Sequence, residues 1–215
     1  MKLNPIYWMM PAVALFGLIS TGEVRAHDLA DALEYPISDP FTCLLGSPFK
    51  ANVEYPVTIQ DLAKKWARIF EIPSSWIISQ AYAESRFHPL AENPSGATGV
   101  LQIKIARALD RVKWMQSSKW WAYDLVRETL ANHWHGLRSD LLNPDLNVML
   151  AAFDLHHLSR RFGRDHDIVA AAYNMGEGAM ARWRVEKEAN KALPLPPRAA
   201  VYIARVRSAK RRGYV

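Results

Sequence analysis

The chain has 215 residues, of which 27 are Lys or Arg and 21 are Asp or Glu, and its formal net charge is +6. Its one cysteine, Cys43, excludes an internal disulfide, so a domain of this size has to be stabilised by packing, and we expect a helical core. Beyond the first 26 residues, the composition of every segment excludes a further membrane-spanning helix.

The first 26 residues have the features of a signal peptide. Lys2 supplies a positive start, and the apolar run from Ile6 to Ser20 has 15 residues, fewer than the roughly 20 that span a bilayer. Val24 and Ala26 stand where a signal peptidase reads the chain. We therefore expect residues 1–26 to direct export to the periplasm and to be cleaved, with an uncleaved anchor as the alternative.

An irregular N-terminal arm is expected over residues 27–57, which contain four prolines and little periodicity. Helical spacing begins at Thr58, which is expected to cap the first helix. The apolar stripe of that helix consists of Leu62, Trp66, Ile69 and Phe70. A second helix is expected to be capped by Ser74 and Ser75 and to end near Arg86, because the next residues lead into Pro89.

The limits of the remaining elements are predicted from Pro, Gly and Asn residues, which are typical of turns and helix ends. Residues 89–99 are turn-rich, residues 100–112 are expected to be helical, and residues 113–142 have an irregular hydrophobic pattern. Further helices are expected from Asp145 or Asn147 to Phe162, from Asp167 to Tyr173, and from Pro196-Pro197 to Lys210. The fold class is therefore mainly α, as a single domain over residues 58–215 with little or no strand.

Glu84 is the candidate acid. It lies at the C-terminal end of an apolar helix, near Ile78 and Ala81, where the helix dipole and partial burial both raise the pKa of a carboxyl. A carboxyl that stays protonated near neutral pH is what protonation of a glycosidic oxygen requires. The alternative for an isolated Glu is an exposed side chain paired with Arg86 or Lys65.

Four motifs in a fixed order include this candidate. They are Glu84-Ser85-Arg86-Phe87-His88-Pro89, Gly96 through Ile103, Asn143-Pro144-Asp145-Leu146-Asn147-Val148, and Ala171 through Gly178. The set resembles the catalytic domain of the soluble lytic transglycosylases, in the lysozyme-like superfamily. That family reads E-S-x-F/W-x-P, G-A-x-G-L-M-Q-I, N-P-x-x-N-I and A-A-Y-N-A-G-x-G. The resemblance covers roughly residues 60–206 and implies a lysozyme-like fold.

The resemblance also implies roles for single residues. It makes Glu84 the only acid/base. Gln102, expected on the next helix, would line the sugar subsites, and Tyr173 would hydrogen-bond near the catalytic carboxyl; a core aromatic is the alternative for Tyr173. Ser85 and Asn174 would support the site.

Several positions depart from the family pattern or need comment. Gly99 lets the backbone approach a ligand closely. Lys104 stands where the family often has Met, and it either adds a charge-assisted contact or faces solvent. Asp154 replaces an aromatic residue, and Ala151 a glycine. Near the end, Arg198-Ala199-Ala200 stands where the family shows E-T-R, so the acidic residue that helps to anchor substrate is missing.

The function implied is that of a peptidoglycan lytic transglycosylase. It would cleave the β-1,4 bond between N-acetylmuramic acid and N-acetylglucosamine and form a 1,6-anhydromuramoyl product, without a cofactor. Glu92 and Glu177 are the nearest candidates for a second carboxylate, but neither matches a family position. A lysozyme-type hydrolase is one alternative, since goose-type lysozymes share the fold and the acid. A non-catalytic peptidoglycan-binding scaffold is the other.

Partners follow from the charge and the aromatic content. The basic C-terminal segment is either a solvated final helix or a binding surface, and as a binding surface it suits acidic peptidoglycan strands better than nucleic acid, which we do not expect. Residues 113–142 add a set of Trp and His side chains that either extend the sugar-binding surface or pack locally: Trp114, Trp120, Trp121, His133, Trp134 and His135. A metal site is not expected, because no metal-ligand spacing occurs.

The small size suggests local wall opening for an envelope-spanning secretion or conjugation complex.

Overall fold

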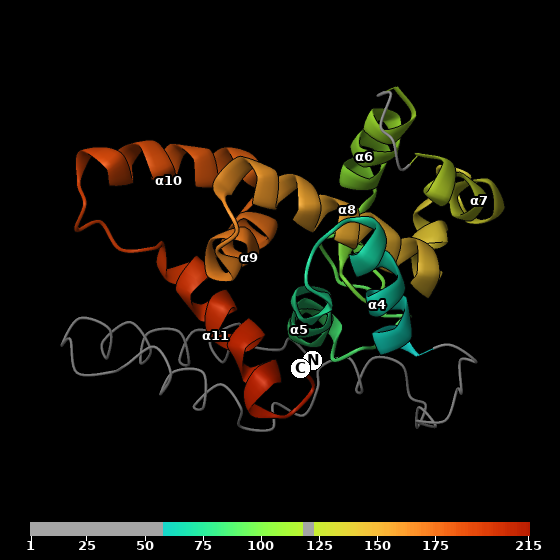
Figure 1. Ribbon diagram of the computed structural model, residues 1–215, viewed down its shortest axis with the longest axis horizontal. Helices are drawn as coiled ribbons and strands as arrows, with labels where there is room; N and C mark the ends of the chain where they lie inside the picture. The colour runs from blue at the N-terminus through green and yellow to red at the C-terminus, as the bar shows by residue number, and fades with distance from the viewer. Residues whose placement is uncertain (1–57, 118–122) are drawn as a thin grey trace, which may run out of the picture. The chain divides into compact units, whose positions relative to one another are not determined.

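The computed structural model describes residues 58–117 and 123–215, which belong to one compact unit (Figure 1). These residues form eight α-helices, one 3₁₀ helix and two short strands: α4 (Ile59–Ile69), α5 (Ser74–Ser85), β1 (Ala97–Thr98), β2 (Ile103–Lys104), α6 (Ile105–Ser117), α7 (Tyr123–His133), η2 (Arg138–Leu142), α8 (Pro144–Phe162), α9 (His166–Met175), α10 (Glu177–Ala189) and α11 (Pro197–Arg211). The predicted mainly α class is confirmed. The expected signal peptide, the N-terminal arm, Trp120 and Trp121 lie outside the described residues.

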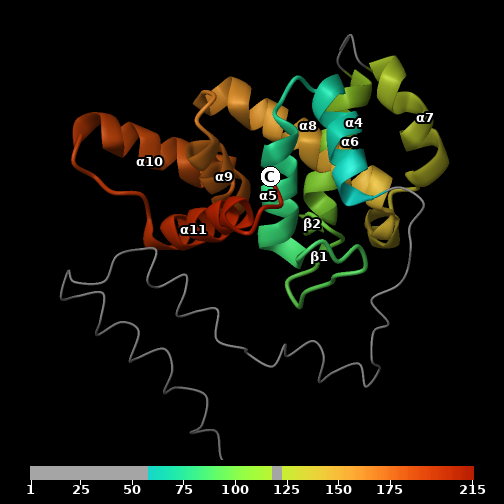
Figure 2. The ribbon, with the colours of Figure 1, turned by 60° about the horizontal axis from the view of Figure 1, so that its bottom comes forward.

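Helix α8 is the centre of the hydrophobic core. It contacts α4, α5, α6, α7 and α9, and it is buried through most of its length, including Leu150, Phe153 and Leu158. Its predicted limits are close to those observed, because Asn143 caps its first turn and Gly163 ends it. Figure 2 shows α5 between α4 and α11, with the two strands near the end of α5 that leads to them.

The ends of α4 and α5 can be explained by local geometry. The side chain of Thr58 accepts a hydrogen bond from the Asp61 amide, as its predicted cap requires. The expected cap of α5 by serine is wrong, because Pro73 already holds the N-cap position in an extended conformation and Ser74 is helical. Arg86 closes α5 in a left-handed conformation, with φ 56°, at the predicted end of the helix.

The predicted helix over residues 100–112 begins late, and Gln102 does not lie on it. Residues 97–104 form an antiparallel pair of strands, with Ala97 opposite Lys104, and α6 starts only at Ile105. Left-handed backbone at Gly99 (φ 81°) and Gln102 (φ 50°) closes the turn between the strands and interrupts helical geometry there.

Two α-helices, α7 and α10, and the 3₁₀ helix η2 were not predicted. Within residues 113–142, taken as irregular, α6 continues to Ser117, α7 follows at Tyr123–His133, and η2 precedes α8. Helix α7 buries Val126 and Leu130, one turn apart, and exposes most of its other side chains. Helix α10 buries only Met180, so its sequence carries little apolar periodicity.

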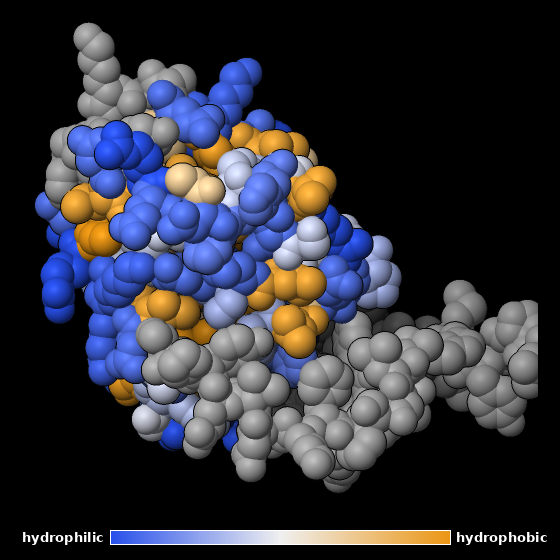
Figure 3. Space-filling view, turned by 90° about the vertical axis from the view of Figure 1, so that its right-hand side faces the viewer, coloured by the Kyte–Doolittle hydropathy of each residue, from blue (hydrophilic) through white to orange (hydrophobic). Residues whose placement is uncertain are grey.

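The face in Figure 3 is largely hydrophilic, with small and separate hydrophobic areas. No described helix combines the length and the apolar character that crossing a membrane requires.

Candidate functional site

Glu84 occupies the last turn of α5 and contacts α11. The hydroxyl of Tyr202 donates a hydrogen bond of 2.7 Å to the Glu84 carboxylate. Tyr202 is only 4% exposed and packs with Val206 of α11 and Ala170 of α9. The residue Glu84 as a whole is partly exposed, and the Tyr202 hydroxyl holds its carboxylate from the side of α11. Neither Arg86 nor Lys65, its expected surface partners, pairs with it; Lys65 binds Asp145 at 2.9 Å.

Burial raises the pKa of Glu84 to about 7, from an ordinary value of 4.5. The hydrogen bond from Tyr202 and the positive charges of Arg205, Arg107 and Arg198 act in the opposite direction, because they favour the ionised form. Burial is the larger effect. At neutral pH the carboxyl is therefore divided between its protonated and ionised forms, as a group that both donates and accepts a proton requires.

The turn between β1 and β2, residues 99–102, is hydrogen-bonded to α5 and to α8. The hydroxyl of Ser85 donates to the Val100 carbonyl at 2.8 Å, which ties the turn to the residue next to Glu84. Asn147, fully buried on α8, accepts from the Leu101 amide at 2.8 Å and donates to the carbonyls of Thr98 and Leu141 at 3.0 and 2.8 Å. Two of these hydrogen bonds fix the strand pair and its turn to α8, and the third ties α8 to the Leu141 carbonyl of η2.

Gly99 has no room for a side chain. Its φ of 81° is one that L-residues rarely adopt, and an added Cβ would overlap Asn147 and the Leu141 carbonyl oxygen. The glycine is therefore required by the packing of the turn on α8.

The structure places the other predicted site residues with different partners. The Gln102 amide nitrogen donates to the Ala91 and Gly99 carbonyls at 3.0 and 2.9 Å, within the turn. Lys104 is exposed on β2. Tyr173 donates to the Leu101 carbonyl at 2.9 Å, so this hydroxyl supports the turn and Tyr202 is the tyrosine bonded to Glu84. Asn174 follows Tyr173, and its side-chain oxygen is buried without a hydrogen-bond partner in the described residues.

Sequence reasoning missed the role of Tyr202. Its position in the last helix matches the tyrosine that follows E-T-R in the family pattern, and that match was the available signal. A tyrosine in a helix of alternating Ala, Val and Arg is otherwise a common core residue.

The departure at Asp154 has a structural explanation. This carboxylate, 3% exposed on α8, forms ion pairs with Arg107 and with Arg111 of α6, the second at 2.7 Å. Arg107 also donates to the Tyr173 carbonyl at 3.0 Å and lies 4.8 Å from the centre of its ring. A buried acid in place of an aromatic residue thus holds two cations of α6 beside the site.

The two carboxylates considered as a second catalytic group are both occupied. Glu92 pairs with Arg138 at 3.1 Å. Glu177 pairs with Arg111 at 3.3 Å, with His157 at 3.0 Å and with Arg161. These partners hold the pKa of Glu177 below its ordinary value. Burial raises the pKa of Glu84 toward neutral pH, whereas the pKa of Glu177 is lowered.

The Trp and His residues of 113–142 are only partly described. Trp114 is 43% exposed and contacts Phe153 with ring centres 5.1 Å apart, while Trp134 packs against the core. His133 contacts the Asn143 side chain at 3.2 Å, and His135 lies 3.4 Å from Asp140. These contacts favour local packing for this part of the set.

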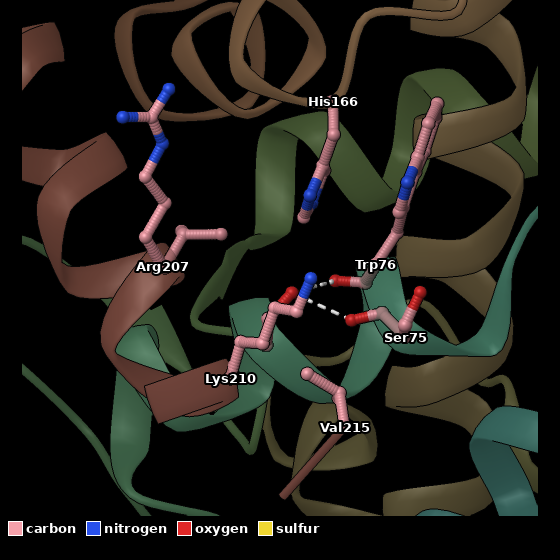
Figure 4. Close-up of a pocket in the computed structure, with 8 residues that line it drawn as sticks. Ser75, Trp76, His166, Arg207, Lys210 and Val215 are labelled. Carbon is pink, nitrogen blue, oxygen red and sulfur yellow. Dashed lines mark hydrogen bonds between the residues drawn. The ribbon is translucent and has the colours of Figure 1, made fainter. Parts of the chain in front are cut away.

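A cavity of about 300 Å³ lies apart from the predicted site residues, between α5, α9 and α11 (Figure 4). The rings of Trp76 and His166 stack on one side of it, with centres 4.9 Å apart, and Arg207 and Lys210 lie on another. Arg207 pairs with Asp167. The cavity does not include Glu84, so it is separate from the candidate acid.

Replacing Tyr202 with Phe is expected to raise the pKa of Glu84 further, because the lost hydrogen bond stabilised the ionised carboxyl. We expect the change to be about one pH unit, the size of one charge-assisted hydrogen bond. NMR titration of ¹³C-labelled glutamate carboxyls measures it directly. Tyr173→Phe is the matched control, since that hydroxyl bonds to a backbone carbonyl. A Glu84 pKa that stays constant or falls in Tyr202→Phe would contradict the assignment.

The chain is similar to known proteins of one family. The transglycosylase SLT domain model matches residues 61–195. The soluble lytic murein transglycosylase of Escherichia coli K12 is 27% identical over 129 residues, and that of Salmonella typhimurium LT2 is 26% identical. Each alignment covers 60% of this chain and 18% of the relative, so the chain matches less than a fifth of those proteins.

Solved structures give the same result. The crystal structure of the 70-kDa soluble lytic transglycosylase from Escherichia coli superposes with a TM-score of 0.50 at 25% identity, covering 72% of this chain and 22% of that one. A complex of the 70-kDa soluble lytic transglycosylase with bulgecin A gives 0.51 at 25% identity, with the same coverage. With the family model matching more than half of its residues, the chain belongs to the transglycosylase SLT domain family.

Proposed function

We infer that this chain is a peptidoglycan lytic transglycosylase in which Glu84 is the only acid/base. The observation that carries this proposal is a single carboxyl with a pKa of about 7, held by Tyr202 and belonging to a partly exposed residue. The two carboxylates considered as alternatives, Glu92 and Glu177, are both ion-paired. Its relatives in the family are lytic murein transglycosylases, which supports peptidoglycan strands as the substrate.

The proposed reaction uses one group twice. Protonated Glu84 gives its proton to the oxygen that links N-acetylmuramic acid to N-acetylglucosamine, as the bond from that oxygen to the muramoyl C1 breaks. The substrate's own acetamido group stabilises the positive charge at C1. Ionised Glu84 then takes the proton of the muramoyl 6-hydroxyl as its oxygen bonds to C1. Glu84 ends protonated, no water is consumed, and the product carries a 1,6-anhydro ring.

The turn and its supports have positioning roles in this proposal. Ser85 and Tyr173 both donate hydrogen bonds to backbone carbonyls of the turn, and the side chain of Asn147 accepts a hydrogen bond from the Leu101 amide. Gln102, Gly99, Lys104 and Asn174 are proposed to contribute to the sugar-binding surface or its support.

Mass spectrometry of glycan fragments tests the reaction. Purified peptidoglycan is treated with the full chain and, in parallel, with Glu84→Gln. Anhydromuramoyl ends released only by the native protein would support the proposal. Reducing ends released only by the native protein would identify a lysozyme-type hydrolase instead. Binding without fragments from either protein would favour a non-catalytic scaffold.

The proposed location is the periplasm, on the basis of the apolar segment Ile6–Ser20. Comparing the N-terminus of the protein from the periplasmic fraction with the encoded one tests export and cleavage; retention in the cytoplasm would contradict it. Local wall opening for a secretion or conjugation complex stays a prediction from the sequence. Failure of the purified chain to capture any component of such a complex would weigh against it.

A further inference from the structure

Two arginines of α11 flank the carboxyl of Glu84. Arg198 and Arg205 stand four residues before and three residues after Tyr202, so all three lie on one face of the helix. Tyr202 reaches Glu84 at 2.7 Å, which fixes the direction of that face toward the acid. Both arginines act electrostatically on Glu84, as expected from this arrangement.

These two cations differ from the neighbouring arginines in their partners. Arg107, on the α6 side, is neutralised by buried Asp154, and Arg207, on another face of α11, pairs with Asp167. Arg198 and Arg205 are exposed, and neither forms an ion pair with a carboxylate of residues 58–117 or 123–215. Their charge is therefore available to a group outside the described chain.

The cations do not help Glu84 to act as an acid. They favour its ionised form, against the effect of burial. A structural role is also not evident, since both side chains are exposed and no hydrogen bond ties them to the fold in the described residues. Binding of an anionic part of the substrate accounts for two cations beside Glu84 that have no ion-pair partner among the residues that the structure describes.

The sequence supports a role specific to this chain. Arg198 stands where the family pattern has the Glu of E-T-R, so the charge at this position is inverted. An anchor that repels carboxylates is replaced by one that attracts them.

We propose that Arg198 and Arg205 form an anion-binding subsite for carboxylates carried on the lactyl arm of the muramoyl residue. The proposal rests on the proposed function, because it takes the substrate from there. Guanidinium groups bind carboxylates through two parallel hydrogen bonds, and two of them on one helix face can hold one carboxylate or two neighbouring ones. The carboxylate comes either from the lactyl group itself or from a peptide attached to it, and the two sources can be separated experimentally.

The test uses three glycan substrates of equal length. One carries intact stem peptides, the second has the same peptides with every carboxyl converted to an amide, and the third has been stripped of peptides to expose the lactyl carboxylate. The full chain, the double variant Arg198→Gln/Arg205→Gln and the control Lys210→Gln are compared by kcat and KM at low salt. Lys210 is an exposed cation of the same helix, and it lines the separate cavity.

The native chain and Lys210→Gln are expected to prefer at least one of the two carboxylate-bearing substrates, the intact or the stripped strands, over the amidated strands by about tenfold in kcat/KM, mainly through KM. The double variant should lose this preference. Because the comparison is a ratio between substrates, any change in the Glu84 pKa affects both and cancels. If the native chain prefers the stripped strands, the ligand is the lactyl carboxylate. If it prefers the intact strands, the ligand is a carboxylate of the peptide. Either result supports the subsite.

Equal rates of the native chain on all three substrates would overturn the proposal, as would a full preference in the double variant. Neither result would affect the proposed function. If the native chain cleaves no strand, the proposed function fails instead. Dissociation constants of the same proteins for the three strands then decide the subsite, with the same expected tenfold ratio and the same overturning result.

Discussion

Glu84→Gln is expected to lower the rate of glycan cleavage by at least about 10³-fold, because the same carboxyl serves as acid and then as base. An amide of nearly the same shape can still accept the Tyr202 hydrogen bond, so the site should stay assembled. Release of fragments from purified peptidoglycan measures the rate. Glu92→Gln is the matched control, since it removes an exposed carboxylate paired with Arg138, and its rate should be close to native. Substantial activity in Glu84→Gln would contradict the assignment of the acid.

The same variant should be more stable than the native chain above neutral pH. Because the pKa of Glu84 is raised from 4.5 to about 7 by burial, the folded state binds more protons than the unfolded state between these values, and its stability falls as pH rises through them. Above about pH 8 the buried charge costs up to about 3 kcal/mol, which Gln avoids. Urea unfolding at pH 4 and pH 8 measures the difference, and a variant destabilised equally at both would count against a buried Glu84.

Gly99→Ala is expected to have the largest effect on stability. A left-handed conformation costs a non-glycine residue about 1–2 kcal/mol, and the overlap of Cβ with Asn147 and the Leu141 carbonyl adds about 1–3 kcal/mol or more. The free energy of unfolding should therefore fall by about 2–5 kcal/mol, measured by urea or thermal unfolding.

Gly96→Ala separates the two causes. Gly96 has nearly the same φ, 83°, but an added Cβ would meet nothing within 4 Å. It should cost only the backbone part, about 1–2 kcal/mol. Equal losses in the two variants would show that packing on α8 does not require the glycine at position 99.

The parts of the site that were predictable from sequence are those with a local signal. Glu84 lies in a recognisable motif at a helix end, and the limits of α8 follow from a capping Asn143 and from Gly163. The strand pair was missed because its turn depends on left-handed backbone at Gln102, where the residue type gives no such signal. The turn is held by a hydrogen bond from the Leu101 amide to Asn147 of α8, a residue far away in the sequence.

The hydrogen bond to Glu84 shows the limit of local reasoning most directly. Tyr202 is 118 residues away in the chain, and its contact depends on how α11 packs against α5 and α9. Likewise, a carboxylate is unexpected at the buried position 154 of α8, and only its ion pairs with Arg107 and Arg111 of α6 explain it. Pairings of this kind are decided by tertiary packing, and single-residue patterns do not contain them.

The distance in sequence between Glu84 and Tyr202 has a consequence for the order of synthesis. Helix α5 leaves the ribosome long before α11, and until α11 docks, Glu84 lacks the neighbour that covers it. A carboxyl in water has an ordinary pKa, so in the incomplete chain it is ionised at neutral pH and has no proton to give. Docking of α11 against α5 is therefore needed to complete the environment that raises the pKa of Glu84, and a chain that ends before α11 is expected to lack an acid that is protonated at neutral pH.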